Sequence, residues 1–513
     1  MRLFSRAIRF LYLGLANWAL TGIYKLIRLS SPLWRFSARH YSEWMGSVGK
    51  VHAYLACAWS SYTVPAYKDY LKQNNYDWKI FSLSSFPETS KETYIKKYTP
   101  LQRCRFGRLS HKGTHIDESA GSSGTPYNWM RSDKELEQIH KNMAGYISLV
   151  LPAKNRFTIN GFSMGAWATG TITGEAAARI GMVKNTGPDI DKIYDTIEHF
   201  GPDFNYLITG YPPFLKQMID EFNIRGFDFS KYNIDALVGG EGITEALRQY
   251  CEQNISRVRS VYGATDLTLG IAGESSFTIW LRNILLENSE LRKLILGSDE
   301  SRTPMIFQYN PLENFLEVNH RNELICTINS SHVLAPKLRY NLGDEVTLFT
   351  LRDITKILKY DKALYKEATR IIKKEPLRIP LMFFFGRADS TISYMGANIY
   401  PQDVEYGIYN DPEIAKHVSR FCLELKENEK LESEPILHIE LNKGSESSPE
   451  ILKGLEEQIS QALLTYLASI NRDIAEAIEE DANGFEIIVR VHRFETGVFS
   501  KMKAGLKNKY LVD

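Results

Sequence analysis

The sequence predicts an α/β protein in which a large layered α/β domain precedes a small α+β domain. Short β-rich runs alternate with helical patterns from about residue 130 to 350, which is typical of a layered sheet. After residue 390, two strand-like runs, one long amphipathic helix and a third strand-like run follow in ββαβ order. The 513 residues, 43% of them hydrophobic, are enough to bury a core of this size.

In the large domain, the expected strands end at glycines. Residues 206–209 form one strand candidate, which leads through Gly210 and Pro212 into a helix from about 214 to 221. Residues 235–238 form the next, and Thr244 is placed to cap the helix behind it. Residues 259–262 supply a third strand, which ends at Gly263. Loops at such strand ends are where open α/β sheets bind ligands.

In the small domain, residues 417–425 and 436–441 are expected to form strands joined by a charged, solvated loop. Pro449 opens a helix whose apolar residues recur at helical spacing, namely Ile451, Leu455, Ile459, Leu463, Tyr466, Leu467 and Ile470. Residues 485–491 complete the domain as a third strand.

The charge is unevenly distributed along the chain. Residues 1–42 contain seven basic residues and no acidic one: Arg2, Arg6, Arg9, Lys25, Arg28, Arg35 and Arg39. The remainder holds 55 basic against 61 acidic residues. No polybasic body is left to bind nucleic acid, so the charge disfavours that partner.

The stretch from Phe10 to Tyr24 is apolar except for Asn17 and Thr21, yet its 15 residues fall short of the roughly 20 that a spanning helix needs. Three interpretations remain open: a helix packed on the protein body, a helix lying in a membrane interface, or a signal or anchor segment. The five cysteines lie far apart and form no CxxC pair, which argues against a disulfide framework or a zinc site and favours a cytoplasmic location.

Residues 119–126, Ser-Ala-Gly-Ser-Ser-Gly-Thr-Pro, form a loop of small and hydroxylated residues. Backbone amides in such a loop can approach an anion closely, and the hydroxyls add donors, so the loop can hold phosphate oxygens. It lacks the GxxxxGK[ST] spacing of a P-loop, and a plain flexible loop is the alternative.

Residues 386–405 read GRADSTISYMGANIYPQDVE. This run resembles the hinge motif GRxDxxIxxxGxxIxPxxVE of the adenylate-forming superfamily of acyl-CoA synthetases, peptide-synthetase adenylation domains and luciferases, and it meets every fixed position. The resemblance implies a large adenylation core, residues 43–388, and a mobile C-terminal lid, residues 389–513. It leaves the basic N-terminal segment, residues 1–42, uncovered.

Other segments follow in the order that the family has. Residues 119–126 resemble its phosphate loop, and 239–241 resemble its adenine-side loop. Residues 262–266, Tyr-Gly-Ala-Thr-Asp, resemble YGxTE, and residues 339–344 resemble the YRTGD segment. The phenylacetate:CoA ligase branch is the most similar, because it shares the aromatic-and-glycine run at 161–167 and a Gly-Glu pair followed by Thr-Glu-Ala-Leu-Arg.

The resemblance assigns roles to residues of this chain. Asp344 would accept the ribose hydroxyls of ATP, Asp266 would hold Mg²⁺, and Thr265 would donate to the α-phosphate. The remaining ATP-binding positions are Ser119, Gly121, Ser122, Ser123, Gly124, Thr125, Gly240, Glu241, Tyr262, Gly263 and Arg387. Phe162, Met164 and Trp167 would form an apolar wall for the acyl group, and ordinary core packing is the alternative for these three.

A lysine of the lid supplies positive charge during adenylation in this family. Lys503 is the best match to its Gly-Lys-Ala ending, and Lys501 is the second candidate. The lid of the family then rotates about a hinge aspartate, which Asp389 matches, and brings Gly396 to a narrow channel for the thiol of coenzyme A.

Two departures from the family pattern affect the phosphate site. Thr125 stands where the family usually carries a lysine before the loop proline, and Asp266 stands where it usually carries a glutamate. The first change removes a cation from the phosphate loop, so pyrophosphate binding is either weaker or supported elsewhere.

The sequence therefore predicts an ATP-dependent, AMP-forming ligase that activates a hydrophobic carboxylic acid and transfers it to coenzyme A. Two alternatives remain: transfer to a carrier protein or an amine, or a nucleotide-binding protein that has lost catalysis. The N-terminal charge favours peripheral contact with the cytoplasmic face of a membrane.

Overall fold

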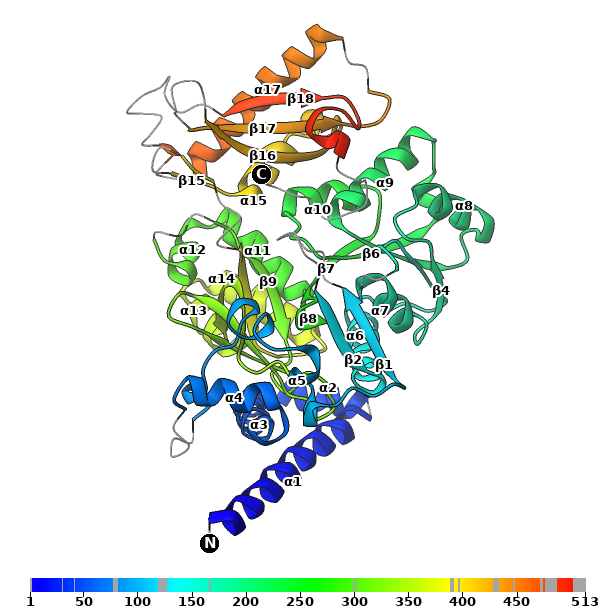
Figure 1. Ribbon diagram of the computed structural model, residues 1–513. Coiled ribbons are helices and arrows are strands. Elements are labelled where there is room, and N and C mark those ends of the chain that lie inside the picture. The colour runs from blue at the N-terminus through cyan, green and yellow to red at the C-terminus, as the bar shows by residue number, and fades with distance from the viewer. Residues whose placement is uncertain are drawn as a thin grey trace.

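The computed structural model describes residues 2–29, 31–40, 42–76, 82–118, 127–165, 168–298, 300, 302–387, 392–394, 397–427, 433–445, 448–470, 474–475 and 487–501. One mixed sheet of eleven strands forms its centre: β3 (Arg156–Asn160), β4 (Met182–Asn185), β5 (Asn205–Gly210), β6 (Asn233–Gly239), β7 (Arg257–Ala264), β8 (Thr268–Gly273), β9 (Met305–Tyr309), β10 (Asn314–Val318), β11 (Glu323–Ile328), β12 (Tyr340–Phe349) and β13 (Leu381–Arg387). The strand order is β10-β11-β12-β13-β9-β8-β7-β6-β5-β3-β4 (Figure 1). Strands β3 to β7 pair in parallel, and the rest pair antiparallel.

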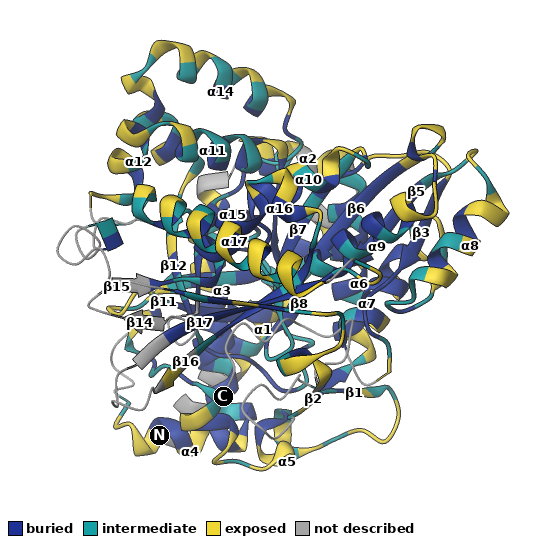
Figure 2. Ribbon diagram, turned by 90° about the horizontal axis from the view of Figure 1, so that it is seen from above, coloured by how far each residue is buried: buried dark blue, intermediate teal, exposed yellow. Residues whose placement is uncertain are grey.

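Helices cover both faces of the parallel half: α6 (Asp133–Val150), α7 (Ala168–Ala177), α8 (Ile190–Phe200), α9 (Pro212–Ile224) and α10 (Glu245–Glu252). Because successive strand residues point to opposite faces, neighbouring side chains of β5 and β6 enter different clusters. Leu207 and Leu237 pack with α6 and α7. Ile208 and Val238 pack in the cluster that α8, α9 and α10 join. The sheet is thus the middle layer, and Figure 2 shows its buried strands enclosed by helices with exposed outer faces.

Four further helices cover one face of the antiparallel half: α11 (Ser276–Glu287), α12 (Ser289–Leu296), α13 (Leu351–Ile357) and α14 (Lys362–Lys374). Ile306 and Phe383 of β9 and β13 pack among them. A hairpin of β1 (Thr114–Glu118) and β2 (Asn128–Ser132) forms a separate two-stranded sheet. Short helical turns occur along the chain of the large domain: η1 (Leu83–Ser85), η2 (Lys91–Ile95), α5 (Pro100–Arg103), η3 (Arg105–Gly107), η4 (Phe229–Lys231) and η5 (Leu358–Tyr360).

The N-terminal segment is helical: α1 (Arg2–Leu29), α2 (Ser31–His40), α3 (Ser42–Thr63) and α4 (Pro65–Gln73). It lies at the end of the molecule opposite the small domain (Figure 1). Helix α3 contacts β10 and β11 of the sheet, and α1 packs on α3. The apolar stretch that the sequence indicates therefore belongs to a 28-residue helix that packs on the protein body. Among the described residues, no helix combines the length and hydropathy that crossing a bilayer requires.

A buried carboxyl anchors α1 to the body. The Tyr24 hydroxyl donates to Glu313, and burial raises the pKa of Glu313 from 4.5 to about 8. Between these values the folded protein holds a proton that the unfolded chain releases, so this group's contribution to stability is present below pH 4.5 and falls as the pH rises to 8. The Glu313→Gln variant keeps a hydrogen-bond acceptor but has no proton to release. Over this pH interval, we expect the free energy of unfolding of the wild type to fall by up to about 1.4 kcal/mol per pH unit more than that of the variant. Urea titrations of both proteins between pH 5 and pH 8 would measure the difference, and parallel pH profiles would contradict it.

The small domain contains a three-stranded sheet of β16 (Val418–Glu427), β17 (Ser433–Leu441) and β18 (Ile488–His492), with β14 (Ile392–Tyr394), β15 (Ala397–Ile399), α15 (Pro401–Tyr409), α16 (Pro412–Ala415), α17 (Pro449–Ile470) and η7 (Gly497–Lys501). Strands β16 and β17 are antiparallel, and β17 and β18 are parallel with α17 in the crossover. The domain rests on α9 and α10: Lys216 Nζ donates to the Val418 carbonyl at 2.7 Å, and the Glu245 amide donates to the Tyr406 hydroxyl at 3.0 Å.

This architecture confirms the predicted fold class, a large α/β domain followed by a small α+β domain. The expected strands at 417–425 and 436–441 correspond to β16 and β17, and α17 begins at Pro449 as expected. The third strand, β18, begins at Ile488, and residues 485–486 lie outside the described part of the chain.

Candidate active site

The turn after β6 is built on two glycines that the backbone requires. A Cβ on Gly239 would lie 2.9 Å from Val261 Cγ2 and 3.0 Å from the Val261 carbonyl oxygen. Any residue with a side chain at position 239 would therefore push β6 and β7 apart. Gly240 has a φ of +86°, a conformation that side-chain-bearing residues rarely adopt. The turn presents Glu241, the residue at the predicted adenine-side position, at the end of the strand.

A buried network of four charges fixes the helix that follows this turn. Thr244 accepts from the Leu247 amide at 3.2 Å and caps α10, as the sequence predicts. Arg248 donates to Glu245 at 3.0 Å and to Glu274 at 2.6 Å, and Arg282 donates to Glu245 at 2.9 Å. These side chains are almost fully buried, so each charge needs its partners, and the network holds α10 rigidly against β7, β8 and α11.

The turn between β7 and β8 carries Thr265 and Asp266, and Arg131 of β2 clamps it. Arg131 is 2% exposed and donates to the carbonyls of Thr265 at 2.8 Å and Leu267 at 2.9 Å. It also donates to Asp117 of β1 at 2.6 Å and to Glu135 at 3.2 Å. One side chain thereby ties the hairpin from which residues 119–126 arise to the turn that bears Asp266. The sequence analysis did not identify Arg131.

Two crossed Tyr–Asp hydrogen bonds join the β7 segment to β12. The Tyr262 hydroxyl of β7 donates to Asp344 of β12, and the Tyr340 hydroxyl of β12 donates to Asp266 after β7 at 2.9 Å. Strands β8, β9 and β13 separate β7 from β12 in the sheet order, so only the folded sheet brings these partners together. The pairs fix both carboxylates that the sequence assigns to nucleotide and metal binding.

The backbone of Arg387 lies opposite Asp344, because β12 and β13 pair in that register. Asp344, which is predicted to bind the ribose, and Arg387, which is predicted to bind ATP beside it, are therefore neighbours on adjacent strands. Tyr262 is itself 8% exposed, and its ring lies 5.1 Å from that of Phe384 on β13.

Two buried cations, Lys337 and Arg103, act on each other, and Asp266 acts on the first of them. Lys337 is 6% exposed, and its ammonium lies 3.8 Å from the ring centre of Trp129 and 5.8 Å from that of Tyr340. Arg103 is 5% exposed, and its Nε is buried without a hydrogen-bond partner. Among the described residues, neither side chain forms an ion pair with a carboxylate. Both cations are thus buried without an ion pair of their own, although the Asp266 and Glu135 carboxylates lie close enough to act on Lys337.

Burial, together with the charges of Arg131 and Arg103, lowers the pKa of Lys337 to about 7, although Asp266 and Glu135 act in the opposite direction. An anion beside Lys337 would favour its protonated form. Trp129 stands on β2, a few residues after the 119–126 loop, so the cation lies near the root of that loop. The sequence analysis missed Lys337; its only sequence signal is a lysine between Pro336 and Leu338 directly before the 339–344 segment.

The aromatic run after β3 is packed into the core where it is described. Phe162 is 1% exposed and meets the Tyr211 ring edge-on at 5.3 Å between ring centres. Met164 accepts a weak bond at 3.7 Å from the Asn160 amide. Trp167 lies outside the described residues, and the role of this run in an acyl pocket stays a prediction.

Several other predicted site residues also lie outside the described residues or have no described side chain. The first group comprises Ser119, Gly121, Ser122, Ser123, Gly124, Thr125, Asp389, Gly396 and Lys503. The side chains of Arg387 and Lys501 belong to the second group. Their assigned roles remain predictions.

Neither a family model nor a curated protein matches the chain. Among solved structures, 2-hydroxyisobutyryl-CoA ligase in the postadenylation state, in complex with R3-HIB-AMP, is 11% identical with a TM-score of 0.66, over 91% of this chain and 89% of that chain. The ligase of the same name in complex with 2-HIB-AMP and CoA in the thioesterification state is 11% identical with a TM-score of 0.54, over 93% and 91%. These likenesses concern the fold, and they extend over both domains. The chain therefore has the fold of these ligases, with a large N-terminal and a smaller C-terminal domain.

Proposed function

We propose that the protein is an ATP-dependent, AMP-forming acid:thiol ligase. A carboxylate oxygen of the acid attacks the α-phosphorus of ATP, and the bond from the α-phosphorus to the oxygen that bridges it to the β-phosphate breaks. Pyrophosphate departs, and an acyl-adenylate remains. The sulfur of coenzyme A then attacks the acyl carbonyl, its proton passes to solvent, and AMP leaves. The observation that carries this proposal is the pair of crossed Tyr–Asp hydrogen bonds. They fix the carboxylates of Asp344, on β12, and Asp266, in the turn after β7.

In this proposal Asp344 accepts the two ribose hydroxyls. A buried carboxylate already oriented by Tyr262 loses little freedom when a nucleotide arrives, which favours binding. Thr265 donates to the α-phosphate from a turn that Arg131 holds in place. Gly240 and Glu241 border the adenine, and residues 119–126 close over the phosphates.

Asp266 suits a magnesium ion held mainly by the nucleotide. It is a partly exposed carboxylate, and within the described part of the chain no group of three metal-binding side chains surrounds it. Mg²⁺ is commonly bound by one or two carboxylates with phosphate oxygens and water, so this donor set fits. When bound, the ion would neutralise charge on the phosphates. Tyr340 keeps the Asp266 carboxylate oriented.

Lys337 and Arg103 would supply the positive charge that Thr125 does not. Both are buried without an ion pair among the described residues, the Asp266 carboxylate acts on Lys337, and Trp129 beside Lys337 lies near the root of the phosphate loop. Charge that accumulates on pyrophosphate as it leaves is stabilised most by cations that are already in place in a site of low polarity.

The small domain supplies the remaining parts of the proposed reaction. Lys503, with Lys501 as the alternative, would stabilise the adenylation transition state. Rotation about Asp389 would then bring Gly396 to the thiol channel. In the described conformation this rotation has to break the bond from Lys216 to the Val418 carbonyl. We place the domain boundary at residues 388 and 389.

The proposed acid is hydrophobic, either aryl or aliphatic, as in the phenylacetate:CoA ligase branch that the sequence resembles. A carrier-protein phosphopantetheine or an amine is the alternative acceptor. All five cysteines are free and buried, which suits the proposed cytoplasmic location.

Exchange of labelled pyrophosphate into ATP, measured with Mg²⁺ and a panel of aryl and aliphatic acids, tests the proposal. We expect exchange with at least one hydrophobic acid, and mass analysis with coenzyme A, holo-carrier protein and amines would identify the acceptor. Lys503→Ala should abolish exchange while ATP still binds, which separates an enzyme from a scaffold that only binds nucleotide. A folded protein that neither binds ATP nor catalyses exchange with any acid would refute the proposal.

A further inference from the structure

Helix α1 exposes a continuous apolar face. Leu11, Leu15, Trp18 and Leu26 recur at helical spacing and are 60%, 66%, 70% and 62% exposed. Gly22 continues the row, and Tyr12 and Ile23 flank it. Single exposed apolar residues are common on soluble proteins, but a contiguous row of this length marks an interaction surface.

The opposite face of the same helix packs on the body and includes two polar residues. Asn17 and Thr21 point inward, where the Asn17 amide oxygen lies 2.9 Å and the Thr21 hydroxyl 3.3 Å from His52 Nε2 of α3. These two residues are 1% and 6% exposed. The inner face also buries Leu13 and Tyr24, so α1 carries apolar residues on both faces, whereas a helix whose outer face meets water carries polar residues there.

Close packing fixes which face points outward. A Cβ on Gly14 would lie 2.9 Å from the Trp59 ring of α3, so only a residue without a side chain fits at this contact. Gly14, Asn17 and the anchor Tyr24 all lie on the inner side. Rotation of α1 to hide its apolar row would break these contacts.

We propose that the exposed face of α1, with the basic pocket at the end of α3, docks on an anionic lipid bilayer. The helix would lie in the interface with its apolar row among the acyl chains, because no described helix can span a bilayer. Tryptophan and tyrosine, which Trp18 and Tyr12 provide, prefer this depth.

The charge of the segment selects this partner over a second copy of the chain. Residues 1–42 hold seven basic residues and no acidic one. Two such segments facing each other would repel, whereas an anionic surface attracts them. One of the seven, Arg39, donates to the Lys373 carbonyl at 2.6 Å.

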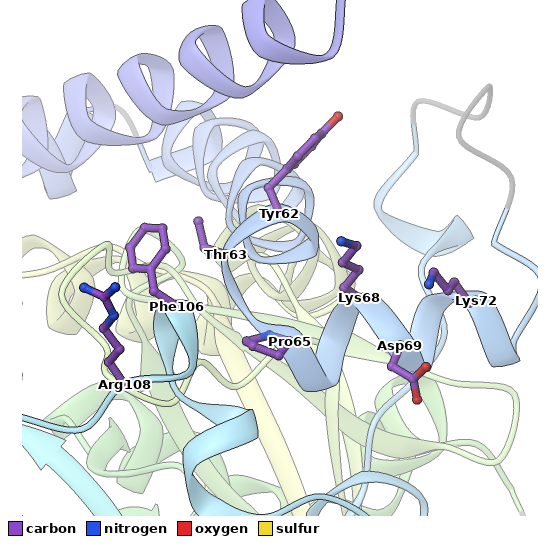
Figure 3. A pocket seen from close by; sticks show the side chains of 8 residues that line it. All are labelled: Tyr62, Thr63, Pro65, Lys68, Asp69, Lys72, Phe106 and Arg108. Carbon is purple, nitrogen blue, oxygen red and sulfur yellow. The ribbon is translucent and has the colours of Figure 1, made fainter. Parts of the chain in front are cut away.

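A basic pocket of about 630 Å³ opens at the same end of the molecule. Its cations are Lys68, Lys72 and Arg108, and Asp69 is the one carboxylate among the lining residues (Figure 3). Helices α1 and α3 run antiparallel, with Gly14 against Trp59 and Asn17 against His52, so the N-terminal part of α1 points toward this pocket. Phe106 beside it is 60% exposed. Phosphate headgroups would fit this combination of cations and exposed apolar side chains.

Co-sedimentation of the full-length protein with vesicles tests the proposal. We expect binding to phosphatidylcholine vesicles that contain phosphatidylserine, at least tenfold weaker binding to phosphatidylcholine alone, and a loss of binding at high salt. Leu15→Glu/Trp18→Glu should weaken vesicle binding at least tenfold. Substitution is preferable to truncation, because Leu13, Tyr24 and Trp34 of this segment belong to the buried core.

Ile224→Glu is the matched control, since Ile224 is 67% exposed at the end of α9 and lies outside α1. It should bind vesicles as the wild type does, and all variants should keep the wild-type melting temperature. Equal binding by the double variant, or no binding by the wild type, would overturn the proposal. A wild-type oligomer that becomes monomeric in the double variant, without vesicle binding, would overturn it in favour of a second copy.

Discussion

Lys337→Met should reduce pyrophosphate exchange by about 10²- to 10³-fold, the range observed when one preorganised charge-stabilising group is removed from an active site. The phosphate loop has Thr125 where the family usually carries a lysine, and in our proposal Lys337, buried beside Trp129 near the root of that loop, supplies the charge instead. The loss should appear mainly in the maximal rate of exchange and in the affinity for pyrophosphate. The affinity for the acid should stay close to that of the wild type.

The same substitution should leave stability unchanged or raise it. Lys337 is 6% exposed and forms no ion pair among the described residues, so burying its charge costs free energy that methionine of similar length does not incur. Lys337→Arg keeps the charge and should retain most of the exchange activity. If Lys337→Met exchanged pyrophosphate at the normal rate, the lysine would have no part in the reaction. A parallel loss of stability and exchange in this variant would show that its role is purely structural.

The residues proposed to bind the nucleotide could be picked out from the sequence because each lies in a short motif, and their roles stay predictions. Tyr262, Asp266 and Asp344 were assigned from their local patterns, and the structure joins them through the two crossed hydrogen bonds. Arg103, Arg131 and Lys337 could not be assigned in this way. They reach the site only through long-range packing of α5, β2 and the segment before β12, and no local pattern records such contacts.

The fold class and the strands β5, β6, β7, β16, β17 and β18 followed from hydrophobic periodicity, which local sequence does record. The orientation of α1 did not. The sequence left open how this segment is placed, and the structure turns Asn17 and Thr21 inward, where both contact His52, 31 residues or more further along the chain. A partner at that distance in sequence decided which face was buried, so the helix was predictable but its exposed face was not.

Asp344→Ala should lower kcat/KM for ATP by on the order of 10³-fold, because two charge-assisted hydrogen bonds to the ribose are lost at about 1.5 to 3 kcal/mol each. Tyr262→Phe removes only the hydrogen bond that orients this carboxylate. It should therefore cost about tenfold, which corresponds to one ordinary hydrogen bond. Pyrophosphate exchange at varied ATP concentration would measure both variants.

Nucleotides that lack one ribose hydroxyl show whether Asp344 acts on the ribose or only on the fold. The wild type should lose activity with both 2′-deoxy-ATP and 3′-deoxy-ATP, since each lacks one of the two donors. Asp344→Ala has no carboxylate left to accept them, so it should use ATP and the two analogues almost equally well. The coupling between the protein change and the nucleotide change isolates this one contact. If wild type and variant lost the same factor on the analogues, Asp344 would not bind the ribose, and its tie to Tyr262 would be structural.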